Sequence, residues 1–463
     1  MSAWRPRVTD GARMKYLGIV EALEADMRSG RVRPGDRLPA QRAVAAALNV
    51  DLTTVTRAFN EARRRGLVDA QPGRGTFIRE ESEREFGAGL AMNPPALDLS
   101  MNIAPQPASA ALQERIPREI AALLSNPRGM LHLHYQESTG SDADRRAGAA
   151  WLESRIKDVQ PGKVLVANGA QSALFGLCRV LFRPGDVVAT GAMTYPGFKA
   201  AALQEGVVLS PLAMDEGGII PDAFERACRD RVPKGLYVIP SVDNPTAATL
   251  TEERRRQLAN IARKHNIIII EDDPYAPLRN TVTPAFATLA PDLTWHIATL
   301  SKCATPALRI AYVVAPSQAQ MLHLAGVLRA TILMASPLMA ALASRWILDG
   351  ELDEITRAIR EENMARQQLA ASILKAASFA ADPCGHHLWL RLPPSVSASD
   401  FAEQANRSGI AVVPSAAFAV GPSSTEAVRV SLGAAVNRAA LEDALSLLVS
   451  MCSHPFLAAR AVV

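Results

Sequence analysis

The stretch Trp295–Ile310, WHIATLSKCATPALRI, contains an apolar run that ends two residues before Lys302. The stretch NIIIIEDDPY at residues 266–275 has the same form, and its apolar run ends two residues before Asp272. Short apolar runs bounded by polar residues are typical of buried strands. Because ligands gather beyond the carboxyl ends of parallel strands, we expect Lys302 and Asp272 to converge on one site.

Similar apolar runs continue through most of the chain. From about Asp98 onward, KVLVA, DVVAT and GLYVIP alternate with helical segments. This alternation predicts an α/β region built on a doubly wound, mostly parallel sheet. We place the region at residues 98–463, with a larger part at about 140–335 and a smaller α+β part at about 336–463.

The pair Lys302 and Asp272 suits an aldehyde cofactor that contains a pyridine ring. A lysine amine bonds covalently to an aldehyde, and a carboxylate keeps a pyridine nitrogen protonated so that the ring withdraws electrons. Gly169, Ala170 and Gln171 follow the run VLVAN and open a helix, so their free N–H groups are expected to hold a phosphate.

Four other side chains have chemistry that matches the same cofactor. Arg309 would add a bidentate phosphate contact. Tyr195, in MTYPGF, offers a face for stacking on the ring, and Asn244, in SVDNPTAAT, offers an amide to the ring hydroxyl. Tyr275 follows Asp272 by three residues and would reach the same ring oxygen.

The first 79 residues have a different organisation, with three short helices and a hairpin. A second helix is predicted near Gln41–Leu48, and Asp51 is placed to cap a third. The following LVDAQPGRGTFI predicts two short strands around a PGRG turn. Residues 80–97 are charged, then contain glycine and Pro-Pro, so we interpret them as a linker.

Charge is concentrated at this end of the chain. The first 80 residues contain 15 Lys and Arg against 9 Asp and Glu, while the whole chain has 50 against 46. The local cationic excess favours a nucleic-acid-facing module. A hydrophobic fraction of 48% with 21% charged residues argues against a disordered or collagen-like chain.

Composition also bears on compartment and metal binding. The five cysteines are scattered, without a C-x-x-C pair, which favours reduced thiols and a cytoplasmic location. The apolar stretch around residues 322–348 is interrupted by charges and Pro337, so it predicts buried helix, and no membrane association is expected. The histidines lack acidic or cysteine partners at ligand spacing, so no metal site is predicted.

The region from Lys15 to Ile78 resembles the GntR family of winged helix-turn-helix repressors in SGRVRPGDRLPAQRAVAAALNV, TTVTRAF, RRRGLV and PGRGTFI. The resemblance implies a double-stranded DNA operator as partner, approached mostly through phosphate contacts. Where that family usually has an arginine at the start of the recognition helix, this chain has Leu52. The residues that the resemblance places near DNA are Arg42, Thr53, Thr54, Arg57, Arg74 and Gly75.

Roughly residues 98–455 resemble the fold-type I aminotransferases, in the order phosphate loop, stacking aromatic, Asn-Pro, Asp-x-x-Tyr, lysine loop and C-terminal arginine. This resemblance implies pyridoxal 5'-phosphate as the cofactor. It makes Lys302 the residue that bonds to the aldehyde and Asp272 the partner of the pyridine nitrogen.

The same resemblance assigns four further roles. Ser301 and Arg309 are implied as phosphate ligands, and Arg429, in VRVSLGAA, as the clamp for a substrate or effector carboxylate. Tyr135 resembles the tyrosine that reaches the phosphate of the neighbouring subunit, which implies a homodimer.

A GntR-like region followed by an aminotransferase-like region is the layout of the MocR subfamily of regulators. The resemblance implies a regulator that senses an amine or amino acid through bound pyridoxal phosphate. Two alternatives stay open: a working aminotransferase that carries a DNA-binding region, and a DNA-binding protein whose aminotransferase fold has lost its cofactor. Lys302, Asp272 and Arg429 serve regulator and enzyme alike, so the sequence leaves turnover undecided.

Overall fold

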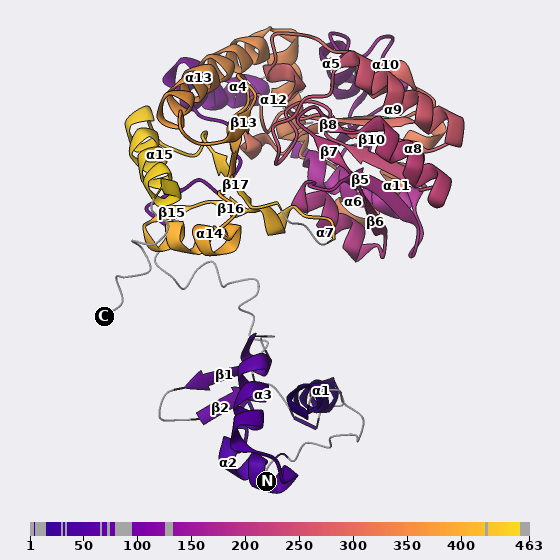
Figure 1. Cartoon of the computed structure of the whole chain (residues 1–463). Helices are drawn as coiled ribbons and strands as arrows, with labels where there is room; N and C mark the ends of the chain where they lie inside the picture. Colours follow the sequence, from indigo (N-terminus) through magenta and orange to yellow (C-terminus); the bar gives the residue numbers. More distant parts are fainter. Residues whose placement is uncertain are drawn as a thin grey trace. The chain divides into compact units, whose positions relative to one another are not determined.

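The computed structural model describes residues 4, 15–28, 31–32, 35–64, 67–71, 75–78, 95–125, 133–421 and 425–453. The chain forms two compact units, Met1–Pro94 and Pro95–Val463 (Figure 1). We call the first unit the head and the second the body. The body begins at Pro95, against the residue 98 expected from the sequence.

The head consists of three helices and a two-stranded antiparallel hairpin, as predicted. Its elements are α1 (Lys15–Arg28), α2 (Gln41–Leu48), α3 (Leu52–Arg64), β1 (Val68–Gln71) and β2 (Gly75–Ile78). In the hairpin, Val68 lies opposite Ile78, and both side chains are buried. They pack with Val20 of α1, Val44 of α2 and Val55 of α3 in one apolar core, so every element of the head contributes to its stability.

Asp51 caps α3 as its sequence position predicts. The backbone N–H of Thr53 donates to a carboxylate oxygen of Asp51 at 2.7 Å. The turn before it is closed by Asn49, whose left-handed backbone (φ 53°) ends α2. Thr56 also donates from its hydroxyl to Gln41 at 2.9 Å, which ties α3 to α2. This local chemistry fixes the angle between the two helices of the helix-turn-helix.

The body is built on a seven-stranded sheet in the order β4-β12-β11-β10-β9-β5-β6. Strand β12 runs antiparallel to β11 and β4, whereas β11, β10, β9, β5 and β6 run parallel to one another. The mostly parallel sheet predicted from the apolar runs is therefore confirmed. The strands are β4 (Val164–Ala167), β5 (Val187–Gly191), β6 (Val208–Leu212), β9 (Gly235–Val238), β10 (Ile268–Asp272), β11 (Thr294–Thr299) and β12 (Ala311–Val314).

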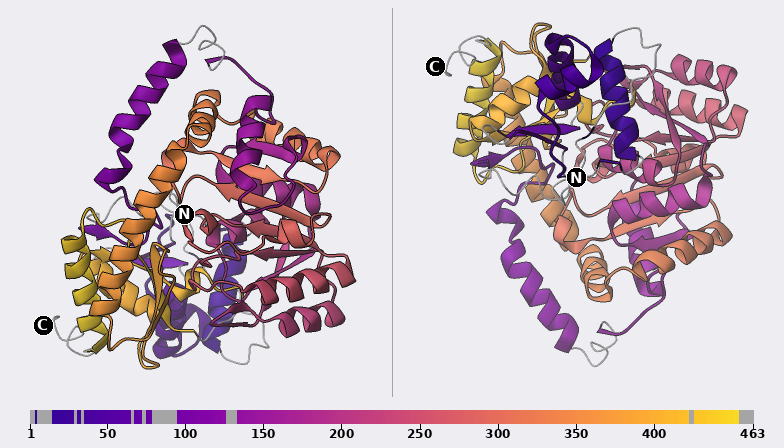
Figure 2. Two further views of the ribbon diagram at one scale, coloured as in Figure 1. Left: turned by 90° about the horizontal axis from the view of Figure 1, so that it is seen from above. Right: turned by 90° about the horizontal axis from the view of Figure 1, so that it is seen from below.

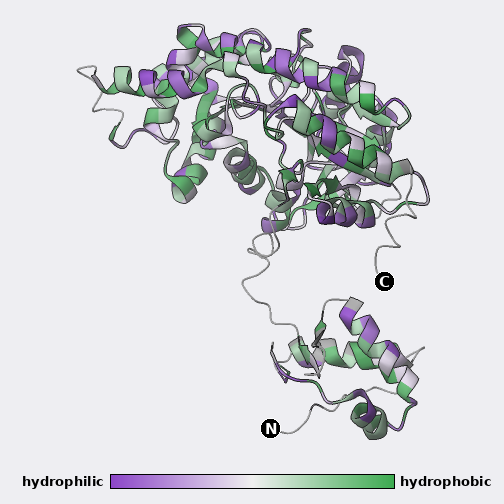
Figure 3. Cartoon of the chain, turned by 90° about the vertical axis from the view of Figure 1, so that its left-hand side faces the viewer, coloured by the Kyte–Doolittle hydropathy of each residue, from purple (hydrophilic) through white to green (hydrophobic). Residues whose placement is uncertain are grey.

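Both faces of this sheet are buried, which explains why its strands are apolar without alternation. In β10, Ile270 packs into the cluster that contains α5, α6, α11 and α12, whereas Ile269 packs into the cluster that contains α8, α9 and α10. Figure 3 shows that the helices of the body carry both apolar and polar residues. The helices of this part are α5 (Asp142–Leu152), α6 (Gly169–Leu181), α7 (Pro196–Gln204), α8 (Pro221–Asp230), α9 (Glu252–His265), α10 (Phe286–Leu289), α11 (Gln318–Ile332) and α12 (Pro337–Leu348).

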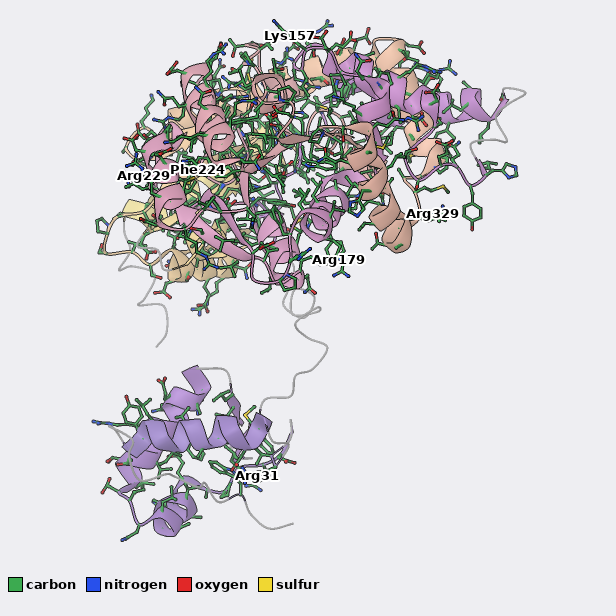
Figure 4. All side chains as sticks on the ribbon, turned by 90° about the vertical axis from the view of Figure 1, so that its right-hand side faces the viewer. Arg31, Lys157, Arg179, Phe224, Arg229 and Arg329 are labelled. Atoms are coloured by element: carbon green, nitrogen blue, oxygen red, sulfur yellow. The ribbon has the colours of Figure 1, made fainter. Side chains whose placement is uncertain are left out.

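Charged residues cover the outer sides of the same helices. Figure 4 labels Arg179 on α6, Arg229 on α8 and Arg329 on α11, and all three side chains are exposed. Phe224 on α8, labelled in the same view, is fully buried. The large part therefore has the three-layer arrangement expected of a doubly wound sheet.

A second, smaller part of the body is built on a four-stranded antiparallel sheet in the order β13-β14-β17-β16. It lies beside the large part, and α13 runs along both (Figures 1 and 2). The elements are α13 (Glu351–Ile373), β13 (Phe379–Ala381), β14 (His387–Arg391), α14 (Ala398–Arg407), β15 (Ile410–Ala411), β16 (Val413–Pro414), β17 (Ala427–Ser431) and α15 (Arg438–Ser453).

The first residues of the body belong to this small part. Strand β3 (Leu97–Asp98) pairs in parallel with β15, and Leu99 is fully buried in the small part's apolar core. The small part is thus made from both ends of the body, whereas the sequence predicted only residues 336–463. The remaining short elements are β7 (Met214–Asp215), β8 (Gly218–Ile219), α4 (Leu112–Ser125) and the 3₁₀ turns η2 (Ala108–Ala110), η4 (Pro161–Lys163), η5 (Ala276–Leu278), η6 (Pro306–Leu308) and η7 (Ser415–Ala417).

Candidate functional site

The predicted residues of the body gather at the carboxyl edge of the large sheet. Lys302 follows β11, Asp272 ends β10, and Gly169 follows β4. Lys302 lies close enough to Asp272, Arg309 and Arg429 for their charges to affect its pKa. The convergence expected from the strand ends is therefore present.

Asp272 is buried and only half satisfied. One carboxylate oxygen accepts a hydrogen bond from the hydroxyl of Tyr237 at 2.9 Å, and the other is buried without a hydrogen-bond partner. Burial raises the pKa of Asp272 to about 6, against the lowering effect of the Tyr237 bond. An unpaired buried carboxylate oxygen is costly unless a cation or donor meets it. A protonated pyridine nitrogen has the chemistry to do so.

Lys302 carries an amine of reduced basicity. Burial lowers its pKa to about 8, and the positive charges of Arg429 and Arg309 act in the same direction, while Asp272 opposes them. Its amine donates a hydrogen bond to the backbone carbonyl of Asn102. A lysine with this pKa is partly neutral near pH 7, which a nucleophilic amine requires.

The start of α6 has backbone geometry that could hold an anion. The helix has no side-chain N-cap, so the first backbone N–H groups, including those of Ala170 and Gln171, have no capping side chain. Gly169 adopts φ +80°, and a Cβ there would lie 2.6 Å from a terminal nitrogen of the Arg309 guanidinium. Only glycine lets Arg309 approach this closely. Ser301 contributes a hydroxyl held 3.0 Å from that of Thr299.

Tyr195 and Gln171 hold each other in place. The hydroxyl of Tyr195 donates to the Gln171 side chain at 3.3 Å, and the Gln171 amide donates to the carbonyl of Gly197 at 2.8 Å. Burial raises the pKa of Tyr195, so its phenol stays protonated. The Gln171 side chain thus acts on Tyr195, whereas the sequence assigned Gln171 through its backbone N–H.

Arg429 and Asn244 form a buried pair. The guanidinium donates to the side-chain oxygen of Asn244 at 2.8 Å and to the backbone carbonyl of Ser100, while its Nε is buried without a partner. Burial lowers the pKa of Arg429. Because the side-chain oxygen of Asn244 accepts a hydrogen bond from Arg429, the amide nitrogen of Asn244 can donate to another acceptor.

Four residues of this site were not predicted from the sequence. Tyr237 lies inside an apolar strand, stacked on Phe198 with ring centroids 3.7 Å apart. Asn102 donates from its side chain to the hydroxyl of Tyr275 at 2.8 Å. Ser100 and His387 complete the set, the latter 3.3 Å from Asn102. Two polar residues that alternate with apolar ones just after the first strand of the body, in DLSMN, are the signal that would have drawn attention to Ser100 and Asn102.

Tyr135 stands apart from the residues above. Its side chain is 83% exposed, on a surface segment before α5. The structure of one chain therefore does not bring Tyr135 into that chain's own site.

The head presents the predicted DNA-binding residues on α2 and α3. Arg42 and Arg57 are exposed and Thr54 is half-buried. The hydroxyl of Thr53 donates to Asp51 at 2.5 Å, so this side chain is engaged in the helix cap. Leu52, where an arginine is usual, is 39% exposed.

The hairpin carries the other two residues that the sequence placed near DNA, Arg74 and Gly75. Gly75 adopts φ +122°, and a Cβ there would lie 2.9 Å from the Nε of Arg37. Arg74 lies outside the described residues. Within the ranges that the structure describes, no three His, Cys, Asp or Glu side chains are grouped as metal ligands. A search of the same ranges for helices with the length and apolarity of a membrane span found none.

Comparison with known families divides the chain in the same way. The model of the family described as "Aminotransferase class I and II" matches residues 95–448, and that of "Bacterial regulatory proteins, gntR family" matches residues 15–78. The two matches fall within the body and the head respectively.

Individual relatives agree with this division. The chain is 32% identical over 456 residues to the uncharacterised HTH-type transcriptional regulator YdeF of Bacillus subtilis, with 96% of each chain covered. It is 28% identical over 324 residues to the probable rhizopine catabolism regulatory protein MocR of Rhizobium meliloti, with 65% of each covered.

Solved structures match the body's fold. The kynurenine aminotransferase of Pyrococcus horikoshii superposes with a TM-score of 0.73 at 22% identity, over 82% of this chain and 96% of that one. The α-aminoadipate aminotransferase LysN of Thermus thermophilus gives 0.71 at 23% identity, over 85% and 98%. At this identity the likeness shows the fold alone.

Proposed function

Since the chain belongs to the aminotransferase class I and II family and joins that fold to a GntR-family head, we propose that ligands bound in the body control its DNA binding. This is the layout of MocR-type transcriptional regulators. The proposed ligands are pyridoxal 5'-phosphate and an amino-acid or amine effector. The head addresses a double-stranded DNA operator, and the protein acts in the cytoplasm. The ligand changes the arrangement of the body, and the heads then meet their half-sites differently.

The observation that carries the proposal is the unpartnered buried oxygen of Asp272. The residues around it fit pyridoxal phosphate: Asp272 would pair with the ring nitrogen, Lys302 would bond to the aldehyde, and Tyr195 would stack on the ring. When bound, this group withdraws electrons from an attached amine. Burial of this oxygen without a partner costs stability unless a bound donor meets it, and a protonated ring nitrogen beside Lys302 and Tyr195 would be such a donor.

The phosphate of the cofactor would lie at the start of α6. Gly169 and Ala170 would supply backbone N–H groups, Arg309 a cationic fork and Ser301 a hydroxyl. Asn244 and Tyr275 would donate to the ring oxygen. The proposed set gives the phosphate, the ring nitrogen, the ring oxygen, the ring face and the aldehyde at least one chemically matched residue each.

An amino-acid effector carries a carboxylate that Arg429 would hold. Its guanidinium is buried and has an unpartnered Nε, and a buried arginine that meets a carboxylate gains a charge-assisted, bidentate contact. We therefore expect amino acids to bind more tightly than the corresponding simple amines.

We further propose that the protein works as a homodimer in which Tyr135 reaches the phosphate of the neighbouring subunit. The 83% exposure of this side chain supports the assignment, because an aromatic ring that has no place in its own chain's core is suited to an interface. Two heads in one dimer would match an operator with two half-sites.

A working aminotransferase is the second candidate function. It is favoured by one observation: the reduced pKa of Lys302 beside Asp272 and Arg429 is what transamination requires. The two candidates differ in turnover and in the response of DNA binding.

The test is a spectrum followed by a DNA-binding measurement. Purified protein is titrated with pyridoxal phosphate and its visible absorbance is recorded, with Lys302→Ala as control. Binding to the DNA upstream of its own gene is then measured without ligand, with cofactor, and with cofactor plus a panel of amino acids. We expect a cofactor-dependent band, lost in Lys302→Ala, and at least a fivefold change in DNA affinity. Unchanged affinity together with rapid transamination would favour the enzyme instead.

A further inference from the structure

Residues 97–99 fix the entry of the chain into the small part of the body. Leu97 pairs with Ile410 across β3 and β15, and the backbone N–H of Ser431 donates to the carbonyl of Leu99 at 2.9 Å. Leu99 itself is fully buried. Leu99 is therefore held in place, and Ser100–Asn102 extend from it into the proposed cofactor site.

Ser100 and Asn102 use their backbone carbonyls on two of the site's cationic side chains. The carbonyl of Ser100 accepts from the Arg429 guanidinium, and the carbonyl of Asn102 accepts from the Lys302 amine. The side chain of Asn102 donates to the hydroxyl of Tyr275 at 2.8 Å. One short segment thus touches the aldehyde-binding lysine, the ring-oxygen tyrosine and the carboxylate-binding arginine.

The orientation of the Asn102 amide is set by His387. The Nε2 of His387 lies 3.0 Å from the carbonyl of Asp243, so this nitrogen carries the proton and Nδ1 is an acceptor. Burial lowers the pKa of His387 to about 3, which keeps the ring neutral. The Asn102 nitrogen, 3.3 Å from Nδ1, must then be the donor, and the hydroxyl of Tyr275 is the acceptor of its second hydrogen.

This arrangement directs the proton of Tyr275. Because its oxygen accepts from Asn102, its own hydrogen is free to be donated elsewhere. Burial raises the pKa of Tyr275, so the phenol keeps that hydrogen. Asn102 therefore prepares Tyr275 as a donor without touching the ligand through its amide nitrogen.

We infer that Ser100–Asn102 is a positioning segment that holds Lys302, Tyr275 and Arg429 ready and gives up its two carbonyl contacts when ligand occupies the site. The inference rests on the proposed function and names its first conformational step. Residues 95–102 are also the part of the body through which the chain continues toward the head.

The chemistry of Lys302 requires the first of these changes. If the neutral amine of Lys302 bonded to the aldehyde carbon of a bound cofactor, a C=N bond would form and the aldehyde oxygen would leave as water with both amine hydrogens. The nitrogen would then carry one hydrogen only when protonated, so the Asn102 carbonyl would lose the amine donor that it meets without ligand. At Arg429 a carboxylate competes with the neutral Ser100 carbonyl, and charge-assisted hydrogen bonds are about twice as strong as neutral ones.

Hydrogen exchange of the full chain tests the release. The amide of Ile103 donates to the carbonyl of Met101 at 2.9 Å, so peptides spanning residues 99–104 report on the segment. Pyridoxal phosphate probes Lys302. The reduced adduct N-(5'-phosphopyridoxyl)-L-leucine brings a carboxylate to Arg429 but has no aldehyde for Lys302.

Each probe is expected to speed exchange in residues 99–104 by about fivefold or more while slowing it in α6 and β10. The side chain of the Lys302→Arg variant still donates hydrogen bonds but cannot bond to the aldehyde. In this variant pyridoxal phosphate should leave the exchange rate of residues 99–104 unchanged, whereas the adduct should still raise it. Gln106→Ala is the matched control, because Gln106 touches the lysine loop at the Ala304 carbonyl without contacting Lys302 or Arg429. It should respond like the wild type.

Slower or unchanged exchange in residues 99–104, with slowing in α6 to prove that the probe bound, would overturn the inference. DNA affinity measured on the same samples separates it from the proposed function. If ligand speeds exchange in residues 99–104 but leaves DNA affinity constant, the proposed function alone is wrong. If ligand changes DNA affinity but not the exchange of residues 99–104, the inference alone is wrong.

A double-mutant cycle tests the positioning of Tyr275 by Asn102. Asn102→Ala keeps the carbonyl but removes the donor to Tyr275, so we expect about a tenfold loss of pyridoxal phosphate affinity and a shifted absorbance maximum. In a Tyr275→Phe background the same change should cost less than twofold. Equal losses in both backgrounds would show that Asn102 does not act through Tyr275.

Discussion

Tyr237 donates its hydroxyl to one oxygen of Asp272 at 2.9 Å and leaves the second oxygen of that carboxylate buried and unpaired. A residue from one strand thus fixes a carboxylate on its neighbour strand without satisfying it. The unpaired oxygen should lower the stability of the ligand-free protein and raise its affinity for pyridoxal phosphate. These two effects can be measured separately.

Without ligand, Asp272→Asn should stabilise the body at pH 8. The folded pKa of Asp272, about 6, lies above its ordinary value, so the stability that its protonated form provides is lost as pH rises through 6. The amide carries no charge to bury, and we expect a gain of about 2 kcal/mol at pH 8 that disappears toward pH 4. Thermal denaturation of ligand-free protein at both pH values measures it.

The same variant should bind pyridoxal phosphate at least tenfold more weakly, because the amide does not pair ionically with a protonated ring nitrogen. Tyr237→Phe serves as the comparison, since it keeps the carboxylate. An Asp272→Asn protein that is no more stable at pH 8 than the wild type would contradict the assignment of an unpaired charge.

Covalent capture of pyridoxal phosphate should depend on the protonation of Lys302. With a pKa of about 8, the neutral amine increases about tenfold between pH 7 and pH 9, and the capture rate should follow it. Arg429→Gln removes a nearby positive charge, so the pKa of Lys302 should rise and the midpoint of the profile should move to higher pH. Stopped-flow absorbance across this range measures both.

The control for that profile is Arg438→Gln, because Arg438 pairs with Glu362 at the surface at 2.6 Å. Its profile should match the wild type. If Arg429→Gln leaves the midpoint in place, the electrostatic coupling between Arg429 and Lys302 is absent.

Gly169→Ala should weaken cofactor binding by at least tenfold. Its Cβ would lie 2.6 Å from the Arg309 guanidinium, and the residue adopts φ +80°. Gly185→Ala shares the unfavourable backbone, at φ +88°, but its Cβ would meet no atom within 4 Å. In both variants alanine is strained at a positive φ. A loss of cofactor affinity in Gly169→Ala that Gly185→Ala does not show therefore reports on the phosphate-binding turn. Fluorescence titration with pyridoxal phosphate gives the two affinities.

Arg42→Ala and Arg57→Ala should each weaken DNA binding across unrelated sequences and reduce the slope of log affinity against log salt by about 1. Both side chains are exposed on the helices of the helix-turn-helix. Arg63→Ala, exposed at the far end of α3, is the control and should change neither quantity. Fluorescence anisotropy at several salt concentrations provides the slopes, and an unaltered slope in Arg57→Ala would remove this residue from the interface.

Asp51→Ala should destabilise the head by about 1 kcal/mol. The carboxylate of Asp51 accepts from both the backbone and the hydroxyl of Thr53, so its loss frees the start of α3. Asp51→Asn, which keeps an acceptor oxygen, should recover most of that stability. Calorimetry that resolves the melting of the head measures both variants.

Sequence reasoning succeeded where the chemistry is local. The end of α2 at Leu48, the cap at Asp51 and the hairpin at residues 68–78 depend on turn and capping residues that lie next to the elements they control. Lys302 and Asp272 could be predicted because each follows its own strand, and parallel strands end at one edge.

The rest depends on contacts between distant parts of the chain. Tyr237 reads as one more apolar residue of a buried strand, and its role appears only when β9 and β10 are adjacent. Asn102 meets Tyr275 across 173 residues, and no spacing rule covers such a pair. The small part's boundary was missed for the same reason, since β3 pairs with β15 from the opposite end of the body.

The pairing of β3 with β15 limits how heads can be exchanged among proteins of this layout. A graft that replaces the DNA-binding module must join upstream of Pro95, because a seam inside residues 97–102 would remove a strand of the small part together with the carbonyls that Lys302 and Arg429 use. A seam placed after Pro95 would separate Leu97 from its pairing with Ile410, so we expect heads to be exchangeable only at joints before that proline.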